Sequence, residues 1–141
     1  MGWRRSILSV AVIAAACGGD TGNTISPTSV TSQTSTEFFA ITVPVQSSRF
    51  YAFSLLEAGT VEITLVRVSP DDGKSTLTTR MGLGNGTPNG TDCDLTNTVV
   101  TPPGLTAQLK IPLGVGTHCA KVFDVGELRT PVNVMVRIVH P

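Results

Sequence analysis

The sequence is poor in the residues from which most functional sites are built. Charged residues occupy 14% of the 141 positions and aromatic residues 5%, and there are two histidines, three cysteines and one tryptophan. Ten basic and ten acidic residues leave no net charge, so no basic surface for a nucleic acid is expected. No basic amphipathic segment is present either. The length allows one domain of ordinary size.

The motifs of the common enzyme classes are also missing. The sequence has no Gly-x-Ser-x-Gly elbow, no phosphate-binding glycine loop and no dinucleotide fingerprint. His118 is expected to be a strand residue partly packed in the core, and His140, the penultimate residue, to be frayed. No histidine is paired in sequence with a free nucleophile. We therefore predict that the protein is not an enzyme and holds no cofactor or metal for catalysis.

The first 20 residues have the pattern of an export signal. Arg4 and Arg5 precede a mostly apolar run, Ser6–Ala16, which is too short to cross about 30 Å of hydrocarbon as a helix. The run ends in three alanines, which suit a cleavage site, and Cys17 follows. This order resembles the lipobox of bacterial lipoproteins, in which a cysteine is acylated and becomes the mature N-terminus. Ala14 stands where the lipobox usually has Leu.

We therefore predict a lipoprotein signal peptide over residues 1–16 and lipidation of Cys17. An ordinary secretory signal cut at the same bond and an uncleaved helical anchor remain as alternatives, and the paired arginines also fit a twin-arginine export signal. The resemblance implies a bacterial cell-envelope location, on the periplasmic face or the cell surface. Acyl chains on Cys17 would make the membrane a partner of the protein.

Residues 17–35 are rich in Ser and Thr and contain one proline and one charged residue. Such a segment buries too little apolar surface to offset the entropy of ordering, so we expect a disordered tether. Removal of Arg4 and Arg5 with the signal leaves eight basic and ten acidic residues in the mature chain.

Residues 36–141 have the pattern of an all-β domain. Short alternating segments recur about every ten residues, which is typical of a sandwich or a barrel rather than of βαβ units. No window has a helical period, so we predict an antiparallel, jelly-roll-like β-sandwich of about eight strands. The clearest expected strands are Thr36–Val43, Arg49–Leu55, Thr60–Val68, Leu77–Leu83, Leu105–Ile111 and two runs within Gly116–Val139.

Several local features are expected within this domain. Alternation in Thr60–Val68 turns Val61, Ile63 and Leu65 inward and Thr64 outward. Residues 84–91, rich in Gly and Asn, are expected to form a long loop tip, and a polar connection should follow Cys93. The two Asn-Gly-Thr triplets of this tip also match a glycosylation acceptor, although turn chemistry explains them better. Gly116–Val139 is expected to close the domain as a hairpin on which the earlier strands pack.

Two cysteines remain after Cys17. Cys93 and Cys119 lie 26 positions apart, and an exported chain favours a disulfide between them, with two free thiols as the alternative. Cys119 shares a strand face with Lys121. We therefore expect the bridge near the solvent side, holding the 84–91 tip to the closing hairpin.

The segments AGTVEITL, MGLGNGT and GTHCAKVFDVGELRTPVNVMVRIVHP together resemble small β-sandwich domains of secreted bacterial proteins, of the pre-peptidase C-terminal type. The similarity covers Thr36–Pro141 and implies a jelly-roll-like sandwich. The chain departs from the family pattern at His118, where an aromatic residue is common, and in following a lipid anchor rather than a peptidase. The family pattern is structural, and no binding residue is carried over.

We predict a non-catalytic envelope lipoprotein whose sandwich is a binding or assembly module, with an envelope protein or a polysaccharide as partner. The alternative is an accessory domain for polysaccharide or calcium. Asp71-Asp72 and Asp92-x-Asp94 offer oxygen ligands for Ca²⁺, although turns also recruit Asp and neither pair has the spacing of a known calcium loop. Sugar-binding surfaces commonly use exposed Trp or Tyr, whereas the only Tyr, Tyr51, is expected to face inward.

Overall fold

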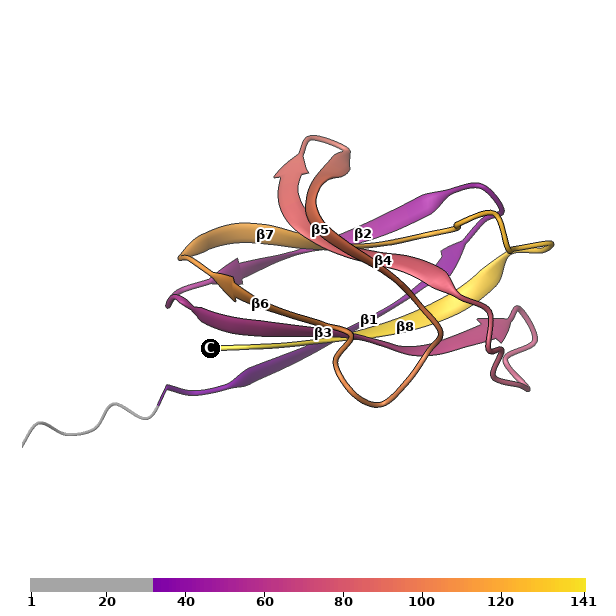
Figure 1. Ribbon diagram of the computed structural model, residues 1–141, viewed down its shortest axis with the longest axis horizontal. Helices are drawn as coiled ribbons and strands as arrows, with labels where there is room; N and C mark the ends of the chain where they lie inside the picture. Colours follow the sequence, from indigo (N-terminus) through magenta and orange to yellow (C-terminus); the bar gives the residue numbers. More distant parts are fainter. Residues whose placement is uncertain (1–31) are drawn as a thin grey trace, which may run out of the picture. The chain divides into compact units, whose positions relative to one another are not determined.

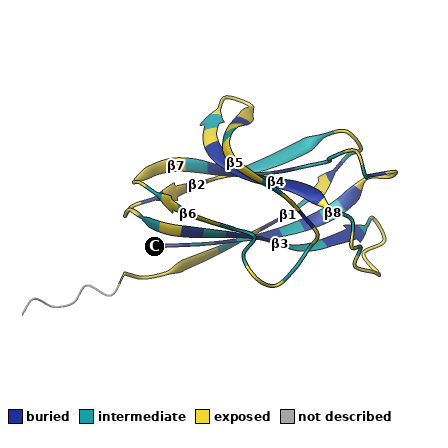
Figure 2. Ribbon diagram, in the orientation of Figure 1, coloured by how far each residue is buried: buried dark blue, intermediate teal, exposed yellow. Residues whose placement is uncertain are grey.

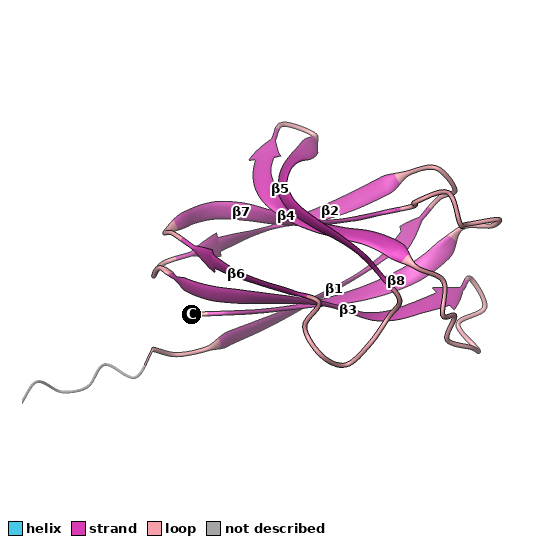
Figure 3. Ribbon diagram, in the orientation of Figure 1, coloured by secondary structure: helices cyan, strands magenta, loops and turns pink. Residues whose placement is uncertain are grey.

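The computed structural model describes residues 32–141; the predicted signal peptide, Cys17 and most of the predicted tether lie outside the described residues. The described part contains eight strands and no helix, and therefore no helix that could cross a membrane (Figure 3). The strands are β1 (Ser35–Val43), β2 (Ser48–Leu55), β3 (Gly59–Pro70), β4 (Met81–Asn89), β5 (Asp92–Thr101), β6 (Leu109–Leu113), β7 (Gly116–Phe123) and β8 (Val132–His140).

The eight strands pair in two antiparallel sheets that lie face to face (Figure 1). Sheet A has the order β1-β8-β3-β6 and sheet B the order β2-β7-β4-β5. Successive strands mostly alternate between the sheets, and this order is that of a jelly roll. The predicted fold class, an antiparallel jelly-roll-like sandwich of about eight strands, is confirmed.

Alternation of side chains builds the core between the sheets. In β8 every second residue is buried, as the period of a strand requires (Figure 2). Each fully buried aliphatic or aromatic side chain contributes roughly 1.5–3 kcal/mol to stability. The core consists of Phe39, Val43, Phe53, Leu55, Val61, Ile63, Leu65, Val68, Met81, Leu83, Ala120, Val122, Leu128, Val132, Val134, Val136 and Ile138.

The predicted closing hairpin over Gly116–Val139 is wrong. Its two strands belong to different sheets, because β7 pairs with β2 and β4 whereas β8 pairs with β1 and β3. The connection between them is long enough to cross from one sheet to the other, and it carries Leu128, which is buried in the core. Alternation in the two strands predicts which residues face inward, but it leaves the pairing partners undetermined.

The segment from residue 77 to residue 101 also differs from its prediction. The strand expected over Leu77–Leu83 begins only at Met81 and continues through the expected loop tip to Asn89. The polar connection expected after Cys93 is β5, the antiparallel partner of β4. Only Gly90 and Thr91 form the turn, where Gly90 has φ 59°. Glycines that normally indicate a loop are therefore strand residues here, because other parts of the chain lie against them on the outer face of sheet B.

The outer face of sheet A is partly covered by the loop before β6. Thr64, expected to face solvent, is fully buried there. The loop extends the edge of β3: Gln108 accepts a hydrogen bond from the backbone N–H of Leu65, and Gly104 donates one to the Leu65 carbonyl. The strand predicted from Leu105 is thus shortened to β6. This strand tolerates Pro112, which has no backbone N–H, because the free side of an edge strand has no neighbouring strand to bond.

Candidate binding cleft on sheet B

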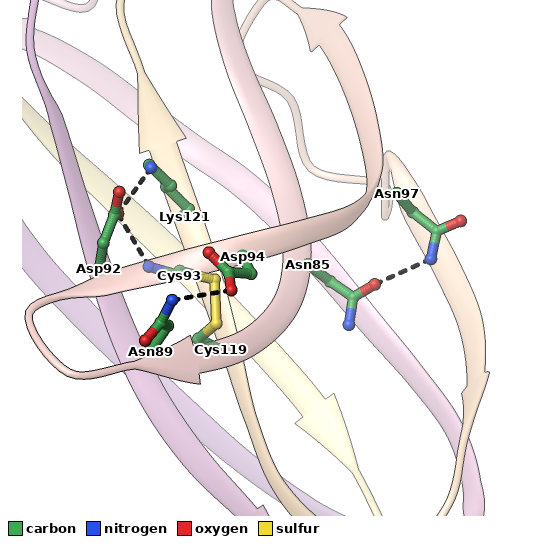
Figure 4. Close-up of a disulfide and its surroundings, with 8 residues drawn as sticks. All are labelled: Asn85, Asn89, Asp92, Cys93, Asp94, Asn97, Cys119 and Lys121. Atoms are coloured by element: carbon green, nitrogen blue, oxygen red, sulfur yellow. Dashed lines mark hydrogen bonds and ion pairs between the residues drawn. A yellow bond between two sulfur atoms is a disulfide. The ribbon is translucent and has the colours of Figure 1, made fainter.

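Cys93 on β5 and Cys119 on β7 form a disulfide, as predicted (Figure 4). The two sulfurs are 1.99 Å apart and the two Cα atoms 6.1 Å apart. Cys119 lies on the outer face of sheet B together with Lys121, also as predicted. Both cysteines are buried, however, rather than open to solvent. The end of the β4–β5 hairpin covers the bridge.

This hairpin bends out of sheet B. In the sheet β4 lies between β5 and β7, so β5 can reach β7 only if the end of the hairpin folds over the outer face. The bend follows a bulge between Asn85 and Gly86, and bulges increase the local twist of a strand pair. Besides the disulfide, the Lys121 ammonium on β7 pairs with the Asp92 carboxylate at 2.6 Å (Figure 4). The hairpin end is thus held to β7 by one covalent and one ionic contact.

Three glycines on β4 form the floor of this outer face, beneath the Phe123 ring and the bent hairpin. Gly82, Gly84 and Gly86 occupy alternate positions, point to the outer face and are buried. A Cβ on Gly82 would collide with the Phe123 ring, one on Gly84 would meet Leu95, and one on Gly86 would collide with the backbone of the folded-back hairpin. These positions need glycine because other parts of the chain lie directly against the backbone.

A cleft of about 600 Å³ opens beside the hairpin on this outer face. Its volume falls within the roughly 300–1,000 Å³ typical of small-molecule sites. Apolar, hydroxyl, amide and charged groups all contribute to the walls. The lining residues are Gln46, Ser47, Ser48, Leu95, Lys121, Phe123, Asp124 and Gly126.

Asp124 organises one wall of the cleft. Its Oδ2 accepts a hydrogen bond from the Gln46 N–H at 2.8 Å, and its Oδ1 accepts bonds from the backbone N–H groups of Gly126, Glu127 and Leu128 at 2.8–3.2 Å. Burial raises the pKa of this carboxyl, but the four backbone donors outweigh burial and hold the pKa below its ordinary value. Both oxygens are thus engaged in holding two loops together.

The charges of the cleft are paired in the same way. The side chain of Lys121 is 14% exposed, and that of its partner Asp92 is 59% exposed. The hydrogen bond from Lys121, with a smaller contribution from the backbone N–H of Cys93, lowers the pKa of Asp92. Asp94, the other carboxylate at the start of β5, accepts a bond from the Asn89 amide at 3.0 Å.

A separate polar network lies between the sheets, at the β1–β2 edge. Tyr51 donates to Glu37 at 2.7 Å, the other Glu37 oxygen lies 2.9 Å from His140 Nε2, and His140 Nδ1 lies 2.8 Å from the Pro141 carbonyl. Burial raises the pKa of Glu37. The hydrogen bonds from Tyr51 and His140 and the charge of His140 together lower it by more, so the pKa lies below its ordinary value. His140 is only 6% exposed and stacks against Phe53, so the expectation of a frayed residue is wrong.

A second pocket, of about 470 Å³, adjoins His140 at the end of the sandwich. Both ring nitrogens of His140 are occupied by Glu37 and Pro141, so this imidazole is not available as a base in the pocket. His118 is half-buried beside Phe53, as expected of a strand residue, with Nε2 2.8 Å from the Gly114 carbonyl.

The aspartates considered for calcium do not converge. Among residues 32–141 no group of three or more His, Cys, Asp or Glu side chains is placed to hold a metal ion. Asp72 accepts the Lys74 N–H on the loop after β3, while Asp92 and Asp94 are engaged within the hairpin.

The cleft itself was not predicted from the sequence. Its walls come from the start of β2, the end of β7 and the middle of β5, which meet only through the sheet order and the bend of the hairpin. One signal was present: glycine at positions 82, 84 and 86 keeps the period of a strand and indicates a backbone that another segment covers.

Removal of the disulfide should destabilise the domain and release the hairpin end. Closing a loop of this length contributes about 3.5 kcal/mol in the chain-entropy model. We expect Cys93→Ser with Cys119→Ser to lower the free energy of unfolding by about 2–4 kcal/mol in urea titrations. Hydrogen exchange at β4 and β5 beyond the bulge should rise more than exchange in sheet A. Equal exchange rates in the wild type and the double variant would contradict the role given to the bridge.

Stability should fall in acid, because the pKa values of Asp124 and Glu37 are lower in the folded than in the unfolded state. Their contribution is present above the ordinary values of 3.8 and 4.5 and is lost as the pH drops through the folded-state values. We expect Asp124→Asn to cost about 1–3 kcal/mol at pH 7 and less at pH 3, measured by urea denaturation.

Asp71→Asn, on an exposed loop, is the matched control for this pH experiment. It should leave the free energy of unfolding unchanged at both pH 7 and pH 3. A constant difference between Asp124→Asn and the wild type at both pH values would refute the assignment.

Comparison with solved structures found a distant structural neighbour. No family model matches the chain, and no curated protein matches it. A chain from Bacillus endospore appendages, described as a novel family of disulfide-linked pili, aligns with a TM-score of 0.37 and 9% sequence identity. The alignment covers 76% of this chain and 87% of that chain.

Proposed function

We propose that the protein is a lipid-anchored component of a bacterial cell envelope and that its jelly roll is a non-catalytic binding module. The cleft on sheet B is the binding site in this proposal. The observation that carries it is the hairpin end, which the disulfide and the Lys121–Asp92 pair hold over the outer face of the sheet to form one wall.

A wall fixed in this way favours binding. A cleft that exists before the ligand arrives avoids the entropic cost of ordering its walls on association. Asp124 similarly fixes the opposite wall through four backbone hydrogen bonds. The polar groups of Gln46 and Ser48 between these walls are available to orient a ligand.

The anchoring part of the proposal rests on the sequence. The arginines at positions 4 and 5, the short apolar run and Cys17 have the order of a lipoprotein signal, and acyl chains on Cys17 would place the module at a membrane surface. The resemblance to pre-peptidase C-terminal domains belongs to the same proposal, and the two-sheet architecture is compatible with it.

The second candidate function is an accessory domain for polysaccharide. The observation that favours it is the Phe123 ring in the cleft, an aromatic surface that the inward position of Tyr51 does not provide. Calcium binding, the other half of that alternative, has no comparable observation among the described residues.

The anchor is tested by changing its acceptor. In cells fed an alkyne-labelled fatty acid, the wild-type chain should incorporate the label and sediment with membranes, because acylation of Cys17 stabilises membrane association. Cys17→Ser should lose both the label and the membrane association. Cys93→Ser with Cys119→Ser should keep both. Label on Cys17→Ser would place the lipid elsewhere and remove this part of the proposal.

The binding site is tested by photo-crosslinking from inside and outside the cleft. A photoreactive residue at Ser48 lies in the cleft, whereas one at Thr36 lies on the exposed outer face of sheet A. In intact cells, we expect the Ser48 probe to attach to a specific envelope component that the Thr36 probe does not capture. Identical products from both probes would argue against the cleft as the site.

A further inference from the structure

The Phe123 ring lies flat against the backbone of sheet B. Ser48, Phe123 and Gly82 are neighbours across β2, β7 and β4 on the outer face. A Cβ on Gly82 would collide with three atoms of the ring, so one face of the ring rests on Gly82. The residue is only half-buried and lines the cleft, and we infer that its other face is turned toward the cleft.

Polar residues at the start of β2 lie on one side of the Phe123 ring, and the apolar side chain of Leu95 lies on the other. Gln46 and Ser48 supply an amide and a hydroxyl from the start of β2, while Leu95 closes the cleft from the hairpin. The Ser47 hydroxyl, also at this wall, accepts a hydrogen bond from Arg49 at 3.3 Å. Hydroxyl and amide groups both donate and accept hydrogen bonds. A ligand that fits must therefore have an apolar face beside a dense edge of polar groups.

The charges of the cleft argue against an ionic ligand. The Lys121 ammonium is already paired with Asp92 at 2.6 Å, and both oxygens of Asp124 accept backbone hydrogen bonds. An anionic ligand would compete with Asp92 for Lys121, and a cationic ligand would compete with backbone donors for Asp124. A neutral ligand leaves these contacts in place, because the hydroxyl and amide groups are not charged.

We propose that the cleft binds a neutral glycan, with one pyranose ring stacked on Phe123 and its hydroxyls bound by Gln46 and Ser48. The face of a phenyl ring carries partial negative charge and attracts the weakly positive C–H groups on one face of a pyranose. This inference rests on the proposed function of the cleft and specifies the class of its ligand. It places the glycan on the outer face of sheet B, away from the inter-sheet network at Tyr51.

The chain contains a matched control for the aromatic surface. Phe38 is 59% exposed, on the outer face of sheet A, outside the cleft. It has the same side chain as Phe123 without the glycine floor or the neighbouring amide and hydroxyls. Loss of non-specific aromatic contact would affect both positions equally, whereas loss of a built site would affect Phe123 alone.

The experiment measures binding of the full chain, purified in detergent, to dextran, laminarin, mannan and xyloglucan, with polygalacturonate as the acidic comparison. Affinity electrophoresis screens the panel and calorimetry gives the affinities. We expect at least one neutral glycan to bind. Phe123→Ala should weaken that binding by about tenfold or more, whereas Phe38→Ala should change it by less than about twofold.

Thermal unfolding of each variant shows whether it is folded. If Phe123→Ala is unfolded, Gln46→Gly serves in its place, because Gln46 is exposed with φ 53°, a conformation that glycine accepts. That variant should weaken binding at least about threefold.

Three results would overturn the inference: no neutral glycan binds, polygalacturonate binds more tightly than every neutral glycan, or Phe38→Ala weakens binding as much as the cleft variant. A specific Ser48 crosslink to another kind of envelope component would then keep the proposed function and remove only the glycan. Loss of both signals would remove the two together.

Discussion

The disulfide between Cys93 and Cys119 determines how the outer face of sheet B is used. Without it, the end of the β4–β5 hairpin would lose its covalent link to β7. With it, the end of the hairpin folds over β7, and Leu95 packs on Gly84 while Phe123 packs on Gly82. The disulfide thereby holds the hairpin end, with Leu95, in place as one wall of the cleft. The Lys121–Asp92 pair acts at the same place, but its largely exposed carboxylate makes it the weaker of the two constraints.

The alternation of side chains along β4 therefore allows close packing on both faces of sheet B. The inward residues of β4, such as Met81 and Leu83, fill the core between the sheets, and their outward neighbours are glycines that admit other chain segments. A larger residue at the outward positions would force the hairpin away, as the collision of a Gly86 Cβ with the backbone indicates. Packing on both faces explains why this strand is almost completely buried near its start.

How far the sequence predicts this structure depends on whether the information is local. Alternation in β8 and β3 identifies the residues of the core, and the export context with two remaining cysteines predicts the bridge, because each depends on period or count alone. The pairing of β7 and β8 could not be predicted, since either strand would bury the same residues in a hairpin or across two sheets. The loop predicted over residues 84–91 is wrong because glycine indicates a loop unless another segment covers it. The prediction of a frayed His140 is wrong for a similar reason: its partner, Glu37, lies 103 positions away.

Comparison of the two polar sites shows why the cleft is the better candidate for binding. In the Tyr51–Glu37–His140 network, both Glu37 oxygens and both His140 nitrogens are occupied within the chain, and Phe39 and Phe53 stack against the rings. Groups engaged in this way stabilise one arrangement of the folded chain. In the cleft, the charged groups are satisfied in the same manner, while the amide of Gln46 and the hydroxyl of Ser48 line an accessible surface beside an aromatic ring. The two sites thus use similar residue types for different roles. The network between the sheets uses its hydrogen bonds to stabilise the fold, whereas the cleft leaves uncharged hydrogen-bonding groups accessible to a ligand.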